Sequence, residues 1–246
     1  MNSFTKNNTS NFFLTSDTWP LPNIDEVECF ECQFDVNAYN DSLYEYVNIL
    51  HPIPIQRAIN KRKAEFLAGR YVAQQALSSL GMFEHNINIG NHRSPTWPDN
   101  YIGSITHSNE IAICAVVRKN HYIALGIDIE ECLEMSFINE IIHTIIDSEE
   151  QQLLKNSPMK FIEAVTIAFS GKESLFKALY PLVGEYFDFK AVKIIKIALE
   201  LGKMTFQIQE KLSAEFTVGV NIEGHFLIRA GASKTMIFTY VALPII

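Results

Sequence analysis

Two spacings of apolar residues alternate along this chain, and together they predict its secondary structure. Runs that alternate with period two, or that are rich in β-branched residues, predict strands at 27–36, 111–117, 122–130, 191–197, 204–208, 216–220, 225–229 and 235–242. Helical spacing and helix-favouring composition predict helices at 41–50, 56–80, 137–146, 148–154 and 159–179. The order of strand, helices and strands, repeated twice, predicts an α+β protein built from two similar halves.

Local signals set the expected limits of these elements. Gly81 should end the long helix 56–80 as a left-handed cap, and Tyr180 with Pro181 should end the helix 159–179. Strands 111–117 and 122–130 are expected to form a hairpin that turns at residues 119–120. We expect a polar N-terminal extension at 1–20, an N-terminal half at 21–125 and a C-terminal half at 126–246.

Composition narrows the class of protein. With 246 residues, of which 48% are hydrophobic, the chain can bury a sizeable core. A net charge of -8 argues against general nucleic-acid binding, which needs a basic surface. We read no signal peptide and no membrane-spanning run, and therefore expect a soluble protein of the cytosol. The CxxC at Cys29 and Cys32 has no second pair at zinc-site spacing, so we interpret both as ordinary strand or loop cysteines.

A candidate metal site follows from the segment GIDIE at 126–130. Side chains alternate along a strand, so Asp128 and Glu130 should share one face. Two adjacent carboxylates repel each other, and a divalent cation between them would relieve that repulsion. Farther along, Glu173 and Lys177 lie four residues apart on a predicted helix and should also share a face. With Lys172 on the same predicted helix, this segment would add a third carboxylate and two cations to the cluster.

Basic residues suggest a phosphate site. Arg62 and Arg70, eight residues apart on the first long helix, should reach one side with Phe66 between them. Arg93 lies in a Pro/Trp loop, and Lys172 with Lys177 adds mobile positive charge. The alternative is that the arginines are solvated surface charges.

His107, in the segment GSITHS at 103–108, offers a second phosphate group. Ser104, Thr106 and Ser108 add hydroxyl groups, and the backbone amides of this segment are expected to form an anion-binding nest. The alternative is a structural, hydrogen-bonding histidine. The apolar stripe on the last long helix is interpreted as core; its members are Phe161, Val165, Ala168, Phe169 and Phe176.

Together these motifs resemble one family. In chain order they are AEFLAGR with the preceding Arg62, RSPTWP at 93–98, GSITHS, GIDIE and FSGKESLFKALYP at 169–181. The series is similar to the phosphopantetheinyl transferases of the surfactin-synthetase-activating and enterobactin type, and it covers about half of the chain, from about residue 60 to 181. GIDIE followed by KES, with a lysine four residues after the glutamate, is the most specific part.

The resemblance implies a pseudo-dimer of two α+β halves with coenzyme A in a cleft between them. It implies Mg²⁺-dependent transfer of 4′-phosphopantetheine from coenzyme A to a serine of an acyl or peptidyl carrier protein, as in siderophore and nonribosomal peptide synthesis. By this resemblance, the metal ligands are Asp128, Glu130 and Glu173. The residues for coenzyme A are Arg62, Arg70, Arg93, Thr106, His107, Lys172 and Lys177.

Two departures and several alternatives accompany this reading. Phe169 stands where the family commonly has tryptophan, and Arg93 where it often has lysine. The proton of the carrier serine could pass to Glu173 or to Glu149, with Lys172 and Lys177 stabilising the leaving group. The alternative functions are a non-catalytic module that binds coenzyme A or a carrier protein, and a Mg²⁺-dependent hydrolase of nucleotide pyrophosphates. A monomer is expected, and the sequence does not name the carrier.

Overall fold

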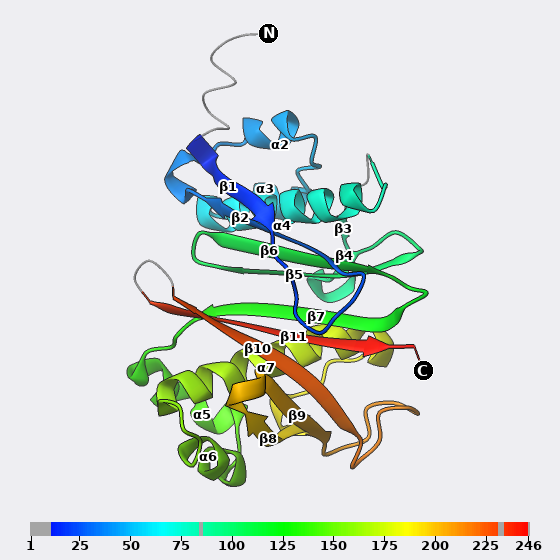
Figure 1. Ribbon diagram of the computed structural model, residues 1–246. Helices are drawn as coiled ribbons and strands as arrows, with labels where there is room; N and C mark the ends of the chain where they lie inside the picture. The colour runs from blue at the N-terminus through cyan, green and yellow to red at the C-terminus, as the bar shows by residue number, and fades with distance from the viewer. Residues whose placement is uncertain (1–10, 84–85, 231–233, 246) are drawn as a thin grey trace. The chain divides into compact units, whose positions relative to one another are not determined.

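The chain folds into two α+β units (Figure 1). The computed structural model describes residues 11–83, 86–230 and 234–245. One compact unit comprises Met1–Ile123 with Ile245–Ile246, and the other comprises Ala124–Pro244. Each unit has its own sheet and its own helices, which confirms the predicted fold class of two α+β halves.

A four-stranded antiparallel sheet, counted over the described residues, forms the base of the first unit. Its order is β1-β2-β6-β5, and its strands are β1 (Phe13–Thr18), β2 (Glu28–Phe34), β5 (Tyr101–Ser108) and β6 (Ile111–Arg118). The short strands β3 (Asn88–Ile89) and β4 (Pro95–Thr96) pair separately. Part of the expected polar extension at 1–20 is thus the edge strand β1, while residues 1–10 lie outside the described residues.

One long helix covers this sheet. α4 (Asn60–Ser79) packs its apolar side on β2, β5 and β6, and Gly81 follows it in the predicted left-handed conformation, with φ 83°. The predicted start at residue 56 was early, because the short helix α3 (Ile53–Gln56) ends before α4 begins. The other helical segments of this unit are η1 (Val36–Ala38), α2 (Ser42–Tyr46) and η2 (Asn91–Arg93).

The second unit places its helices against a second sheet. Over the described residues, the strand order is β7-β11-β10-β9-β8. The strands are β7 (Tyr122–Glu131), β8 (Val192–Ala198), β9 (Lys203–Ile208), β10 (Asn221–Ala230) and β11 (Thr235–Pro244). The helices are α5 (Met135–Ile145), α6 (Ser148–Lys155) and α7 (Phe161–Val183), with the 3₁₀ segments η3 (Phe189–Ala191) and η4 (Leu199–Leu201).

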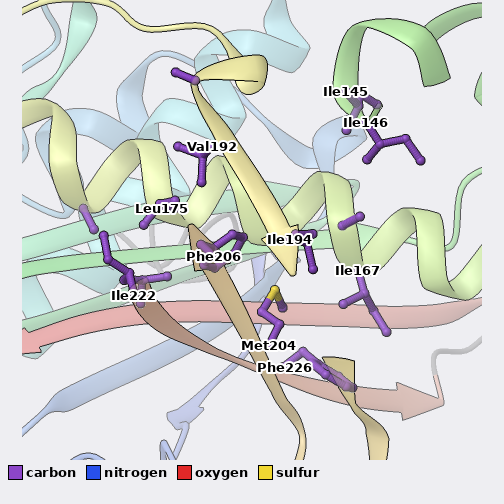
Figure 2. Close-up of a cluster of buried hydrophobic side chains, with 14 of the residues drawn as sticks. Ile145, Ile146, Ile167, Leu175, Val192, Ile194, Met204, Phe206, Ile222 and Phe226 are labelled. Atoms are coloured by element: carbon purple, nitrogen blue, oxygen red, sulfur yellow. The ribbon is translucent and has the colours of Figure 1, made fainter. Parts of the chain in front are cut away.

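α7 packs along this sheet and supplies much of the core of the second unit (Figure 2). Ile167 and Leu175 of α7 meet Phe206 of β9 and Ile222 of β10 in one buried cluster. The predicted stripe on this helix is confirmed as core, since Val165 and Ala168 are fully buried and the three phenylalanines pack around the cluster. No helix in the described ranges has the length and apolarity needed to cross a membrane.

Three predicted details were wrong. β6 pairs with β2 and β5, and β7 belongs to the other sheet, so residues 119–120 do not turn a hairpin. Residues 216–220 are not a strand. α7 continues through Pro181 to Val183 and ends at Gly184 in the left-handed conformation. A proline in the last turn removes only one hydrogen bond, which the remaining turn tolerates.

Strand and helix approach each other very closely in the second unit at Gly126. A Cβ atom on this residue would lie 1.9 Å from the carbonyl oxygen of Ser174 and 2.6 Å from the amide nitrogen of Ala178. Only a residue without a side chain fits at that distance. Gly126 therefore lets the backbone of α7 rest directly on β7.

The substitution Gly126→Ala should destabilise the second unit, because the new methyl group meets helix backbone that cannot rotate away. We expect a loss of at least about 2 kcal/mol in the free energy of unfolding, measured by urea titration. Gly219→Ala is the control: a Cβ there meets nothing within 4 Å, and at φ 89° it should cost only about 1 kcal/mol of backbone strain. Equal losses in the two variants would contradict the close packing at Gly126.

Candidate functional site

The face of β7 that α7 covers carries the carboxylates. Gly126, Asp128 and Glu130 alternate along β7 and so point to the same side of the strand. Glu173 and Lys177 lie one turn apart on α7, flanking Ser174, whose carbonyl faces Gly126. The close packing at Gly126 thus brings the two predicted motifs together.

Asp128 is the buried centre of this group. It is 4% exposed, and its Oδ1 lies 2.6 Å from Nζ of Lys177. Its Oδ2 accepts a hydrogen bond of 2.8 Å from the hydroxyl of Ser170, and Lys177 also donates to the carbonyl of Ile127 at 3.2 Å. The carboxylate is therefore held from both sides by α7.

Glu130 and Glu173 are partly buried and electrostatically coupled to Asp128. Burial raises the pKa of Glu130 to about 8, and the charge of Asp128 adds to the rise while Lys177 opposes it. Burial also raises the pKa of Glu173, with Lys177 opposing and Asp128 adding. Neither carboxylate has a hydrogen bond or an ion pair with any other described residue. Proximity of the three acids therefore makes their simultaneous ionisation costly.

This donor set fits a divalent cation that prefers oxygen ligands. Two carboxylates that have no partner among the described residues, with a third nearby, are the groups such an ion would neutralise. Among the described residues, no three such side chains already stand at the spacing of a metal cage. Lys177 instead neutralises Asp128, and a bound ion would require this flexible side chain to move aside. The residues fit the ion in chemistry, and their final spacing would depend on its binding.

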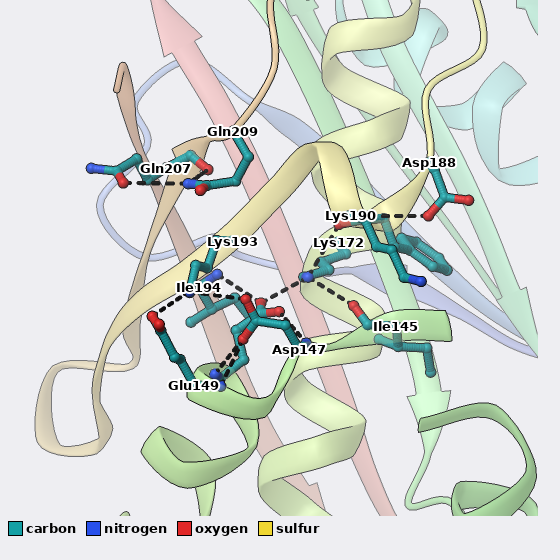
Figure 3. A network of polar contacts seen from close by, with 12 residues as sticks. Ile145, Asp147, Glu149, Lys172, Asp188, Lys190, Lys193, Ile194, Gln207 and Gln209 are labelled. Carbon is teal, nitrogen blue, oxygen red and sulfur yellow. Dashed lines mark hydrogen bonds and ion pairs between the residues drawn. The ribbon is translucent and has the colours of Figure 1, made fainter. Parts of the chain in front are cut away.

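Lys172 faces away from this cluster, contrary to the expectation that it reaches a phosphate. Its side chain is 2% exposed and pairs with Oε1 of Glu150 at 2.7 Å. It also donates to the carbonyls of Ile145 at 2.8 Å and Phe189 at 3.2 Å (Figure 3). Burial lowers the pKa of Lys172, and Glu150 opposes that change. One residue on a helix rotates the side chain by about 100°, so Lys172 points into the core while Glu173 points to β7.

Glu149 also differs from expectation, and its neighbour Glu150 takes the buried position. Glu149, the second candidate base, is 81% exposed and forms an ion pair with Lys193 on β8 (Figure 3). Glu150 is the buried residue of the two, and it accepts hydrogen bonds from the amides of Asp147 at 2.9 Å and Ile194 at 2.8 Å. The structure therefore places Glu149 in a surface ion pair and gives Glu150 a structural role.

In the first unit, α4 and β5 bring Arg62 and His107 together. Nη1 of Arg62 lies 2.9 Å from Nε2 of His107, and Oε2 of Glu65 lies 3.5 Å from the same Nη1. Two phosphate-binding candidates from distant parts of the sequence thus share one place. Glu65 was not predicted as part of it.

The remaining candidates take separate positions. Arg70 is 8% exposed, donates from Nε to the carbonyl of Ile87 at 2.9 Å, and lies 4.3 Å above the ring of Phe66. Burial, with a further contribution from Arg62, lowers the pKa of Arg70 to about 10.

Thr106 is buried on the face of β5 opposite to His107, and Arg93 is exposed at the end of η2 with φ 65°. Residues 104–108 form a regular strand and not the predicted nest.

Sequence signals existed for some of the missed residues. Asp147 and Glu150 have the spacing of a capping box, which the structure confirms, and this pattern could have pointed to Glu150. Glu65 stands three residues after Arg62, a spacing at which opposite charges meet on a helix. Ser170 carries no signal of its own, because only the packing of α7 on β7 places it at Asp128.

Comparison with known proteins agrees with this geometry. Residues 51–117 match a model described as the 4′-phosphopantetheinyl transferase N-terminal domain, and residues 124–228 match the 4′-phosphopantetheinyl transferase superfamily. The chain belongs to the 4′-phosphopantetheinyl transferase superfamily. The second match contains β7 and α7, and so contains the carboxylate cluster of this superfamily member.

Individual relatives point the same way. The chain is 37% identical over 145 residues to enterobactin synthase component D of Salmonella typhi, and 40% identical over 128 residues to that of Escherichia coli K12. These matches cover 59% and 52% of this chain, but only 59% and 60% of the relatives' own lengths. The 4′-phosphopantetheinyl transferase Svp of Streptomyces mobaraensis is 28% identical over 212 residues, or 84% of each chain.

The structural role of Lys172 leads to a test. Lys172→Met leaves the charge of Glu150 buried without a partner, so we expect a loss of about 3–5 kcal/mol in the free energy of unfolding, measured in urea. The double variant Lys172→Met, Glu150→Gln should recover much of this loss, because it buries no lone charge. Lys234→Met, which breaks the exposed ion pair with Glu134, is the control and should change stability little. Wild-type stability of Lys172→Met would show that the pair does not hold this helix.

Proposed function

We propose that this protein transfers the 4′-phosphopantetheine group of coenzyme A to a serine hydroxyl of a carrier protein. The observation that carries the proposal is the joining of Asp128, Glu130, Glu173 and Lys177 by β7 and α7, within the segment that matches the superfamily. The named relatives support a carrier of the peptidyl type in siderophore synthesis, since two of them are enterobactin synthase components.

The reaction exchanges one phosphorus–oxygen bond for another. The serine oxygen forms a bond to the phosphorus that bears the pantetheine arm, and the bond from that phosphorus to the bridging oxygen breaks. Adenosine 3′,5′-bisphosphate leaves with the bonding electrons, and the serine proton passes to a carboxylate. There is little covalent work for the protein to do, so catalysis depends on position and charge.

A Mg²⁺ ion held by Asp128, Glu130 and Glu173 would neutralise charge on the phosphate oxygens during transfer. The chain's own residues do the remainder. Glu173 is the better proton acceptor, because it lies in the cluster, whereas Glu149 pairs with Lys193 at the surface. Lys177, whose flexible side chain is 28% exposed, can turn from Asp128 to the negative charge of the departing bisphosphate.

The first unit by itself carries basic groups suited to a phosphate anion. Arg62 is 43% exposed and His107 31% exposed, so both remain accessible to an anion. Arg70 is fixed through Nε and Phe66, and its two terminal nitrogens have no acceptor among the described residues. A fixed guanidinium with open terminal donors favours a phosphate, because little side-chain freedom is lost on binding.

The transferase is tested by intact-mass spectrometry of apo carrier proteins incubated with this protein, coenzyme A and Mg²⁺. We expect a mass gain of one phosphopantetheinyl group that a chelator prevents, and a faster gain on a peptidyl carrier than on a fatty-acid carrier. Free 4′-phosphopantetheine without carrier modification would indicate a pyrophosphate hydrolase. Tight binding of coenzyme A with no product of either kind would indicate a non-catalytic module.

The metal ligands are tested by Asp128→Asn and Glu173→Gln. Each variant removes one negative oxygen ligand, and we expect transfer to fall by at least about 100-fold while circular dichroism shows a folded protein. Glu140→Gln, which changes an exposed glutamate on α5, is the matched control and should keep wild-type transfer. Near wild-type rates in Asp128→Asn or Glu173→Gln, with Mg²⁺ as the sole divalent ion, would refute the assignment.

A further inference from the structure

Where α4 contacts β5, Arg62, Glu65 and His107 form a second charged cluster. A Cβ atom on Gly69 of α4 would lie 2.9 Å from Cγ2 of Ile105, so the helix approaches the strand closely at this point. Ile105 and His107 share one face of β5, and Arg62, Glu65 and Gly69 recur at the spacing of one helix face. The residue without a side chain therefore sets the distance at which Arg62 and Glu65 meet His107.

The contact between Arg62 and His107 determines the protonation of the ring. A guanidinium has donors and no acceptor, so the 2.9 Å contact requires Nε2 of His107 to accept. A histidine that accepts at Nε2 is neutral and carries its single ring proton at Nδ1. The geometry thus selects one tautomer of His107.

Glu65 accounts for the orientation of Arg62. Its side chain is 12% exposed, and its Oε2 lies 3.5 Å from Nη1 of Arg62 and 3.9 Å from Nε2 of His107. A carboxylate this buried is unfavourable unless a cation accompanies it, so Glu65 draws the Nη1 edge of Arg62 inward. The Nε and Nη2 atoms of Arg62 have no acceptor among the described residues, and they remain for another ligand.

We infer that Glu65 is a positioning residue of the coenzyme A site. It holds the Nη1 edge of Arg62 against His107, which fixes His107 as the Nδ1–H tautomer and leaves the outer donors of Arg62 arranged for a phosphate group. This inference rests on the proposed function for the identity of the phosphate, but the contact between Glu65, Arg62 and His107 can be tested alone. Fixing the arginine in advance favours binding, because less side-chain freedom is lost when the phosphate arrives.

The tautomer is tested first, by ¹⁵N NMR of the full chain labelled at histidine. The His107 signals are assigned by their absence in His107→Asn. We expect the Nδ1–H form in the wild type, and a shift away from it in Glu65→Ala and in Arg62→Ala. An Nε2–H or doubly protonated His107 in the wild type near neutral pH would overturn the inference, whatever the protein catalyses.

Binding is tested next, by steady-state kinetics and by calorimetric titration with coenzyme A. Glu65→Ala should raise KM and Kd for coenzyme A about fivefold, the effect of one lost hydrogen bond, with kcat within about twofold of wild type. Glu65→Gln keeps an oxygen acceptor for Arg62 and should recover part of the affinity. Glu163→Ala on α7 breaks a pair of the same spacing with Lys160, the residue just before α7, and should leave both constants unchanged.

The outcomes separate this inference from the proposed function. Unchanged KM and Kd in Glu65→Ala, or a fall in kcat alone, would overturn the positioning role. If coenzyme A binds without any transfer, the Kd values still test Glu65 while the transferase fails. If coenzyme A does not bind at all, its phosphate is not the ligand and the inference fails with the proposed function, even where the tautomer is as expected.

Discussion

The direct packing of α7 on β7 at Gly126 is the contact on which the candidate site depends. A strand and the helix that packs on it are normally separated by a layer of side chains. At Gly126 that layer is missing, because a Cβ atom would lie 1.9 Å from the carbonyl oxygen of Ser174. The polar ends of Asp128 and Lys177 can therefore meet at 2.6 Å in a largely buried setting. Burial then strengthens the coupling among all three acids.

Two lysines of α7 have different roles: one stabilises the fold, and the other belongs to the candidate site. Lys172 is enclosed by Glu150 and two backbone carbonyls, and this closed set ties the helix to the ends of α5 and η3. Lys177, on another side of the helix, pairs with Asp128 and stays partly exposed. Removing a partner from a closed buried pair affects stability, while an accessible lysine can exchange its partner for a phosphate. The same residue type therefore serves two purposes five residues apart.

In the first unit, a glycine of α4 likewise allows a close contact between helix and strand. Gly69 brings the helix close to Ile105, and the two arginines of the helix then find different anchors. Arg70 is fixed by the ring of Phe66 and a backbone carbonyl, whereas Arg62 is fixed by His107 and Glu65. In both arginines some N–H donors bond to groups of the protein and others have no acceptor among the described residues. Hydrogen bonds through only part of the guanidinium orient it without neutralising its charge.

Much about this protein was determined by sequence alone. Period-two and helical spacing identified most strands and helices, and the alternation in GIDIE placed Asp128 and Glu130 on one face before any fold was known. The motif series identified the family, because its spacing reflects residues that act together. The i, i+4 rule likewise paired Glu173 with Lys177 correctly.

Only the tertiary structure decided which charged side chains are buried and paired with other groups of the protein. Periodicity gives the angle between neighbouring side chains, but not which side of the helix another element will cover. Lys172 became internal because groups of α5, α6 and η3 enclose its side of α7, and Glu149 stayed outside because Glu150 took the buried position. Likewise, His107 met Arg62 only because α4 packs on β5 at Gly69. Burial and partner choice depend on contacts between distant segments, and these form only when the whole unit is folded.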